Sequence, residues 1–200
     1  MIRLYESVPS GVTVDGKFYK CNFDFKNVLK MLDIMQRTDI VPEARDCICI
    51  KCVYSHRIRA KNVRKLYEAI TDVLFEKTPE TGAKRLTSFE QDAPLIRAAF
   101  RQVYGINLFH AKLSWFEFTE LLHGLPEGNR YEDVIGIRAK PLPAPNKYNA
   151  KERQSLLEAK QRVALHLTEA EAEKKYDADV SKIFAGLMNM IPKEVKQDGK

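Results

Sequence analysis

The chain has 200 residues, of which 44% are hydrophobic and 30% are charged, enough for one globular core or two small ones. The 33 basic and 27 acidic residues are interspersed, so the net charge of +6 permits nucleic-acid binding without indicating it. No apolar run approaches the roughly 20 residues of a bilayer span, and the first residues lack the pattern of a secretory signal. We therefore expect a soluble protein that crosses no membrane and stays in the cytoplasm where it is made.

The first predicted element is a small β-hairpin. Residues 12–22 alternate polar and apolar side chains around Asp15 and Gly16, a pair that favours the positive φ angles of a tight two-residue turn. From Asp24 the pattern changes, and apolar residues recur at spacings of three and four as far as Met35. Because Asp24 is placed to accept hydrogen bonds from the first backbone amides, we expect a helix to begin after it.

Two more helices are expected before residue 77. Pro42 suits a first helical turn, and the helix that follows is apolar around most of its circumference from Ala44 to Cys52, which predicts burial. Asn62 then opens a third helix with one apolar stripe, formed by Val63, Leu66, Tyr67, Ile70, Val73 and Leu74. Residues 78–82 carry two breakers in a polar run, so we predict a linker there, after a first region of residues 1–77.

Beyond this linker, capping signals mark two further helices. Thr87 and Glu90 have the spacing of a capping box ahead of an apolar stripe, and Gly105 is the stop signal of the helix that the stripe predicts. Ser114 and Glu117 repeat the box ahead of an aromatic-rich helix. Another short helix follows and completes this group.

The last part of the chain is predicted to be extended and then helical. Alternating prolines within residues 140–146 favour a semi-rigid connector, followed by a basic helix over 150–167. We assign residues 86–168 to a second region, and residues 169–200 to a charged tail whose terminal amphipathic helix covers 180–191. The predicted fold is mainly α: a small N-terminal β-hairpin, a multi-helix bundle and an extended helical C-terminal tail.

The cysteines do not form a disulfide framework. Cys47, Cys49 and Cys52 crowd into one apolar segment while Cys21 stands alone, so we expect free thiols. The helical spacing of Cys49, Cys52 and His56 would suit three zinc ligands, with Cys21 as a fourth. Because these thiols interleave with Ile and Val residues, we favour ordinary packing of small apolar side chains, and we predict neither a metal nor a cofactor.

No catalytic motif stands out. The four histidines lie in segments without a Ser or Cys nucleophile motif, and the nine glycines build no phosphate-binding loop, so we do not expect an enzyme. The basic run at residues 56–65 is the best nucleic-acid candidate, since it spans a helix-turn-helix-like junction. It has no interleaved aromatic residues to stack on bases, and its second helix is committed to a core stripe, so we favour a solvated corner.

Aromatic and apolar residues suggest where a protein partner binds. Trp115, Phe116 and Phe118 cannot all share one helical face, so at least one should pack internally, with core packing favoured for Trp115, and one should lie near the surface. The C-terminal stripe either docks on its own domain or captures a partner. From pattern alone we predict a set of partner-binding residues: Trp115, Phe118, Phe184 and Leu187.

Over about residues 1–168 the sequence resembles the bacteriophage "gene product fifteen" family. The likeness rests on three runs, FEQDAPLIRAAF at residues 89–100, YGINL at 104–108 and LSWFEF at 113–118. Shorter pieces stand in matching order, including VDGK at 14–17 and IGIR at 135–138. The chain departs from the family pattern where LSWF replaces an expected Leu-His-Trp-Trp-like run, and its last 32 residues have no counterpart in that pattern.

The resemblance implies a function in phage tail morphogenesis. Family members are encoded near the tape measure gene of siphophages and prophages and are thought to be tail assembly chaperones. We therefore expect this chain to bind the tape measure protein, to recruit the major tail protein and to be absent from the mature virion. Two alternatives stay open, a structural virion component such as a connector or tail completion protein, and a small nucleic-acid-binding regulator; a homo-oligomer is also open.

Overall fold

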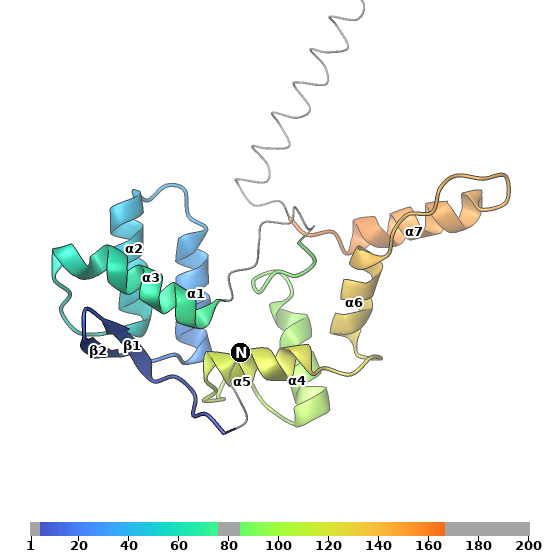
Figure 1. Cartoon of the computed structure of the whole chain (residues 1–200). Helices are drawn as coiled ribbons and strands as arrows, with labels where there is room; N and C mark the ends of the chain where they lie inside the picture. The colour runs from blue at the N-terminus through green and yellow to red at the C-terminus, as the bar shows by residue number, and fades with distance from the viewer. Residues whose placement is uncertain (1–4, 76–84, 167–200) are drawn as a thin grey trace, which may run out of the picture. The chain divides into compact units, whose positions relative to one another are not determined.

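The computed structural model describes residues 5–75 and 85–166 (Figure 1). Residues 1–165 form one unit, and residues 166–200 form a second unit of which only His166 is described. The described residues contain a two-stranded antiparallel hairpin and seven α-helices, which confirms the predicted mainly α fold. The predicted linker at 78–82 and the tail at 169–200, including its amphipathic stripe, lie outside the described residues.

The hairpin forms where the sequence predicts it. Strand β1 (Gly11–Val14) pairs with β2 (Lys17–Lys20), and the register places Val12 opposite Tyr19. Both turn residues adopt positive φ, 48° at Asp15 and 74° at Gly16, as a tight turn of this hand requires. Val12 and Tyr19 are buried, so the hairpin contributes one face to the core.

Three helices complete the first half of the described chain: α1 (Phe25–Met35), α2 (Pro42–Val53) and α3 (Val63–Leu74), the last preceded by a short 3-10 turn η1 (Ala60–Asn62). As predicted, the Asp24 carboxylate caps α1 by accepting from the backbone N–H of Lys26 at 2.9 Å. Helix α2 packs between α1 and α3, and β1 packs on α3. The fully buried residues Met31, Ile50 and Ile70 show that each helix contributes one face to the same core.

Helix α2 is buried on one face, and not around most of its circumference as its apolar pattern predicted. Its buried face carries Asp46, Cys49, Ile50 and Val53, whereas Ile48 is 41% exposed. The reason is that α1 and α3 cover only one side of the helix, and a polar residue occupies part of that side. The Asp46 carboxylate, nearly fully buried, is paired with the Arg64 guanidinium at 3.1 Å.

The second half contains α4 (Ala93–Tyr104), α5 (Trp115–His123), α6 (Arg130–Ala139) and α7 (Ala150–Arg162). The capping box of α5 is confirmed: Ser114 Oγ accepts from the N–H of Glu117, and the Glu117 carboxylate accepts from the N–H of Ser114. The stop signal of α4 is also confirmed, because Gly105 adopts a left-handed φ of 68°.

Two boundaries differ from prediction. The capping box at Thr87 and Glu90 does not begin α4, which starts at Ala93. Pro94 explains the shift, because a residue without a backbone N–H is accommodated in the first turn of a helix and not in its interior. The basic helix α7 ends at Arg162, before the predicted end at residue 167.

A buried ion pair ties the ends of α4, α6 and α7 together. Arg138 of α6 donates two hydrogen bonds to the Asp92 carboxylate at the start of α4, at 2.7 and 2.8 Å. The same guanidinium donates to the backbone oxygens of Leu86 and Val163, so it makes four hydrogen bonds in all. Asp92 also accepts from the N–H of Ser88. The two charges are therefore paired as well as buried, with side-chain exposures of 6% and 2%.

The two halves share one hydrophobic core. Asp24 and Ser114 form an antiparallel backbone bridge, next to which the N–H of Trp115 donates to Phe23 O at 2.7 Å. The indole Nε1 of Trp115 donates to Leu74 O, at the end of α3, at 3.1 Å. Within the described part of the first unit, the two halves thus meet along α5, which positions the surface between α1 and α4.

Candidate partner-binding groove

The aromatic residues predicted to bind a partner lie in the core. Trp115 is 6% exposed and Phe118 is 1% exposed. The Phe118 ring is stacked between Phe25, at a centroid distance of 4.8 Å, and Phe100, at 5.3 Å. Neither Trp115 nor Phe118 is exposed to a partner in this structure, and Phe184 and Leu187, the other two residues predicted, lie outside the described residues.

An apolar groove opens above this aromatic core, between α1 and α4. Both helices pack on α5, and the space between them is a cavity of about 330 Å³. Its lining is mostly apolar and comes from α1, α4, α5 and two turns: Phe25, Lys26, Leu29, Phe89, Ala93, Ile96, Arg97, Leu108, Phe109 and Phe118. Phe118 thus contributes to the groove as part of its wall, from its place in the core.

Local structure explains why the groove stays open. Leu29 follows Phe25 by one helical turn, so both side chains leave the same face of α1. On α4 the small side chain of Ala93 stands one turn before Arg97, which leaves room at the start of the helix. The turn after Gly105 then carries Phe109 to the groove, where its ring is 67% exposed.

One end of the groove is basic. Lys26 Nζ donates a hydrogen bond to the backbone oxygen of Phe109 at 3.0 Å. The Arg97 guanidinium lies over the Phe109 ring, 4.9 Å from its centroid, in a cation–π contact. Two cations from different helices therefore contact Phe109 at this end, Lys26 at its backbone oxygen and Arg97 at its ring.

Two acidic residues stand near lining residues in the sequence, but neither of them lines the groove. Asp33 lies one turn after Leu29 on α1, and Glu90 follows Phe89 directly. Burial, and then the negative charge of Glu90, raise the pKa of Asp33 above its ordinary value, so the two carboxylates lie close enough to repel. The residues that line the groove are therefore mostly apolar, and the charged ones among them are the two cations Lys26 and Arg97.

Neither cation of the basic end was predicted from the sequence as a site residue, and nor was Phe109. Phe109 belongs to no apolar stripe, because it stands in a turn between the stop signal of α4 and the cap of α5. The sequence pattern predicts that Lys26 and Arg97 are ordinary solvent-exposed charges on amphipathic helices. The signal that would have pointed to them is a phenylalanine in the connection between two helices, outside any helical stripe.

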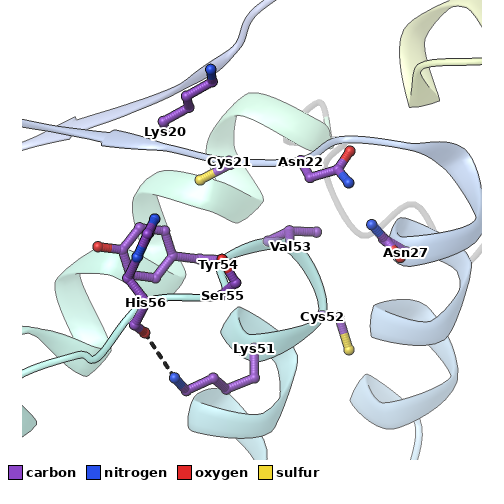
Figure 2. Close-up of a pocket in the computed structure, with 10 residues that line it drawn as sticks. All are labelled: Lys20, Cys21, Asn22, Asn27, Lys51, Cys52, Val53, Tyr54, Ser55 and His56. Carbon is purple, nitrogen blue, oxygen red and sulfur yellow. Dashed lines mark hydrogen bonds between the residues drawn. The ribbon is translucent and has the colours of Figure 1, made fainter.

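A second cavity, of about 320 Å³, contains three of the four residues of the zinc hypothesis (Figure 2). Figure 2 shows the Cys21 and Cys52 sulfurs pointing in different directions; they donate weakly to Tyr19 O and Ile48 O, respectively. Burial raises the pKa of Cys21 to about 11, which keeps its thiol protonated. Within residues 5–75 and 85–166, no group of three His, Cys, Asp or Glu side chains is arranged to hold a metal ion.

The basic run at 56–65 forms an exposed corner between α2 and α3. Two of its charges are paired with acids: Arg64 with Asp46 and Glu68, and Lys65 with Asp15. The field that this corner offers to a phosphate backbone is therefore partly neutralised. Among the described helices, none has the length and apolar content of a membrane span.

Residues 4–165 match the profile of the family described as Bacteriophage Gp15 protein. The chain belongs to this family. The matched residues cover almost all of the first unit, including the hairpin, all seven described helices and the groove between α1 and α4. No curated protein and no solved structure matches the chain. The resemblance drawn from the sequence is therefore confirmed at the level of the family, and the protein is a phage protein.

Proposed function

We propose that this member of the Gp15 family is a tail assembly chaperone of the host cytoplasm that binds the tape measure protein, recruits the major tail protein and leaves before the virion is complete. It acts by binding and not by catalysis. Family membership supports a phage role. The observation that carries the binding role is the apolar groove between α1 and α4, which opens beside an exposed aromatic ring.

The groove suits temporary binding of an amphipathic helix. A tape measure protein is a very long helical protein, and its apolar stripes are exposed until tail tube subunits cover them. A cavity of about 150 Å³ holds a benzene-sized group, so the 330 Å³ groove has room for about two such side chains. Two buried side chains give a gross gain of about 3–6 kcal/mol, from which the cost of association is subtracted. The resulting affinity is modest, as release to tail tube subunits requires.

Co-expression with the tape measure protein of the same phage tests this function. The expected result is that the tape measure protein becomes soluble and is recovered in a complex with this chain. Equal solubility with and without the chain, together with no complex by pull-down, would contradict the proposal. Mass spectrometry of purified virions tests the alternative, because a stoichiometric amount of this protein there favours a structural virion component.

A matched pair of variants assigns the effect to the groove. Phe109→Ala removes the exposed ring at the groove, whereas Tyr148→Ala removes a ring that is 96% exposed in the loop before α7. Because both rings are largely solvated, neither change should unfold the protein. We expect Phe109→Ala to reduce the amount of complex and Tyr148→Ala to leave it unchanged.

A further inference from the structure

We propose that the groove between α1 and α4 binds a helix of a partner protein that carries an acidic residue one turn away from an apolar pair. The carboxylate of this helix lies at Lys26 and Arg97, and its apolar side chains fill the cavity beside them. This inference rests on the proposed function and adds the chemistry of the segment that binds. Charge complementarity with the residues that line the groove carries it.

Every charge in the lining of the groove is positive. Lys26 and Arg97 are its charged residues, and the rest of the lining is apolar. Both cations are half-buried, yet neither forms an ion pair with an acid of residues 5–75 or 85–166. Arg64, Lys65 and Arg138 differ, because each of them is paired with an acid of the chain. The apolar cavity therefore adjoins two positive charges that attract an anionic group.

Both cations have donors left for a carboxylate. Lys26 Nζ has three N–H donors and gives one of them to the backbone oxygen of Phe109, 3.0 Å away. The Arg97 guanidinium lies 4.9 Å from the centroid of the Phe109 ring, and it donates no hydrogen bond to another described residue. A planar guanidinium over a ring can bind a carboxylate through two N–H groups at its edge. An acidic side chain placed beside Phe109 therefore meets donors from two different helices.

The cavity beside these cations takes apolar side chains. Leu29 and Phe89 line it and are only half-buried, so they have apolar surface that a partner can cover. In a helix, side chains three and four positions apart lie on the same face, with Cβ atoms about 5–6 Å apart. An acid at position i with leucines at i+3 and i+4 therefore presents a carboxylate and an apolar surface to the groove together. This is the pattern of an amphipathic helix whose apolar stripe is bordered by acids.

Three synthetic helical peptides test this chemistry with the full-length chain. Each carries leucines at i+3 and i+4, and the flanking positions i and i+7 are two glutamates, two glutamines or two lysines. Because both flanks are the same, the result does not depend on the direction in which the helix lies. Binding is measured by fluorescence anisotropy of the labelled peptide at low salt.

We expect the glutamate peptide to bind about fivefold more tightly than the glutamine peptide, and the lysine peptide to bind most weakly. Added salt should reduce the preference for glutamate, because it screens the charges. Equal binding of the three peptides, a different order, or no binding of any would overturn the inference.

A matched pair of double variants separates the groove from the diffuse positive charge of the chain. Lys26→Gln with Arg97→Gln removes both cations of the lining. Lys30→Gln with Arg101→Gln removes two exposed cations that stand one turn further along the same helices and do not line the groove. The net charge falls by the same amount in both variants.

The preference for glutamate over glutamine should vanish in the first double variant and stay about fivefold in the second. The glutamine peptide uses the apolar surface alone, so its unchanged affinity for both variants shows that the groove is intact. A preference that survives in the first variant, or one that vanishes in both, would contradict the inference.

The two proposals can fail separately. If the tape measure protein is held in solution but the peptides show no preference for glutamate, the chaperone function stands and the charge chemistry is wrong. If the peptides show the expected preference but the tape measure protein is not held, the groove binds acidic helices of another protein and the chaperone function is wrong.

Discussion

Replacing Arg138 by methionine should destabilise the protein more than any surface change. The guanidinium donates two hydrogen bonds to Asp92 and one each to the backbone oxygens of Leu86 and Val163. Methionine fills a similar volume but donates nothing. The Asp92 carboxylate, 2% exposed, would then keep the N–H of Ser88 as a partner and lose its counter-charge.

The expected loss is large because a buried charge is left unpaired. Breaking a buried ion pair from one side typically costs about 3–5 kcal/mol, a large share of a domain stability of roughly 5–15 kcal/mol. Replacing both partners, as Arg138→Met with Asp92→Leu, removes both charges. It still leaves two backbone oxygens and the N–H of Ser88 without partners, but the two oxygens lose their partner in Arg138→Met as well. One unpaired N–H costs about 1–3 kcal/mol, which is less than an unpaired buried charge costs. The double variant should therefore be more stable than Arg138→Met alone.

Urea unfolding followed by tryptophan fluorescence measures these free energies. Trp115 is the single tryptophan of the chain and is buried in the shared core, so its emission reports on the unit that contains the ion pair. A loss below about 1 kcal/mol for Arg138→Met would refute this reasoning. A double variant whose loss equals the sum of the two single losses would also refute it, since the coupling would then be absent.

Three further predictions concern a cap, two thiols and one carboxylate. Ser114→Ala should lower the free energy of unfolding by about 1 kcal/mol in the same assay, because α5 loses the side-chain acceptor of its capping box. Ser114→Asp should retain most of the capping free energy, because a carboxylate is also a good acceptor at this position. Burial raises the pKa values of Cys21 and Cys49 to about 11, so roughly one part in a thousand of each thiol is ionised at pH 8. Both should therefore react with a thiol reagent only after unfolding. Fast reaction of either thiol in the native protein would contradict this. Folding raises the pKa of Asp33, so the free energy of unfolding falls as the pH rises from the pKa of the unfolded chain through the pKa of the folded chain. Asp33→Asn should therefore raise the free energy of unfolding by a few tenths of a kcal/mol at pH 7, a gain that disappears below the pKa of the unfolded chain.

Local signals predicted most of the fold. The turn at Asp15 and Gly16, the cap at Asp24 and the stop at Gly105 each act within a few residues, so the sequence around them is sufficient. The exposure of α2 could not be predicted in this way. Which face a helix buries depends on how many neighbours cover it, and its apolar pattern alone does not specify that number.

Long-range polar contacts were also beyond the sequence patterns. Asp92 and Arg138 lie within two of the runs that carry the family resemblance, yet nothing in either run shows that they meet across 46 residues in a buried pair. The groove also depends on contacts between residues that are far apart in the sequence. Its basic end combines Lys26 of α1 with Arg97 of α4, and the packing of both helices on α5 brings the two to the same residue, Phe109.

The structure separates the residues that hold the groove together from those that can select a partner. Phe118 stacks on two rings in the core, so Phe118→Ala would cost about 3–5 kcal/mol of stability, and any loss of binding in that variant would reflect unfolding as much as lost contact. Phe109 lines the groove and is exposed, and its substitution leaves the aromatic core intact. A loss of complex in Phe109→Ala at an unchanged free energy of unfolding therefore reports on recognition and not on loss of fold.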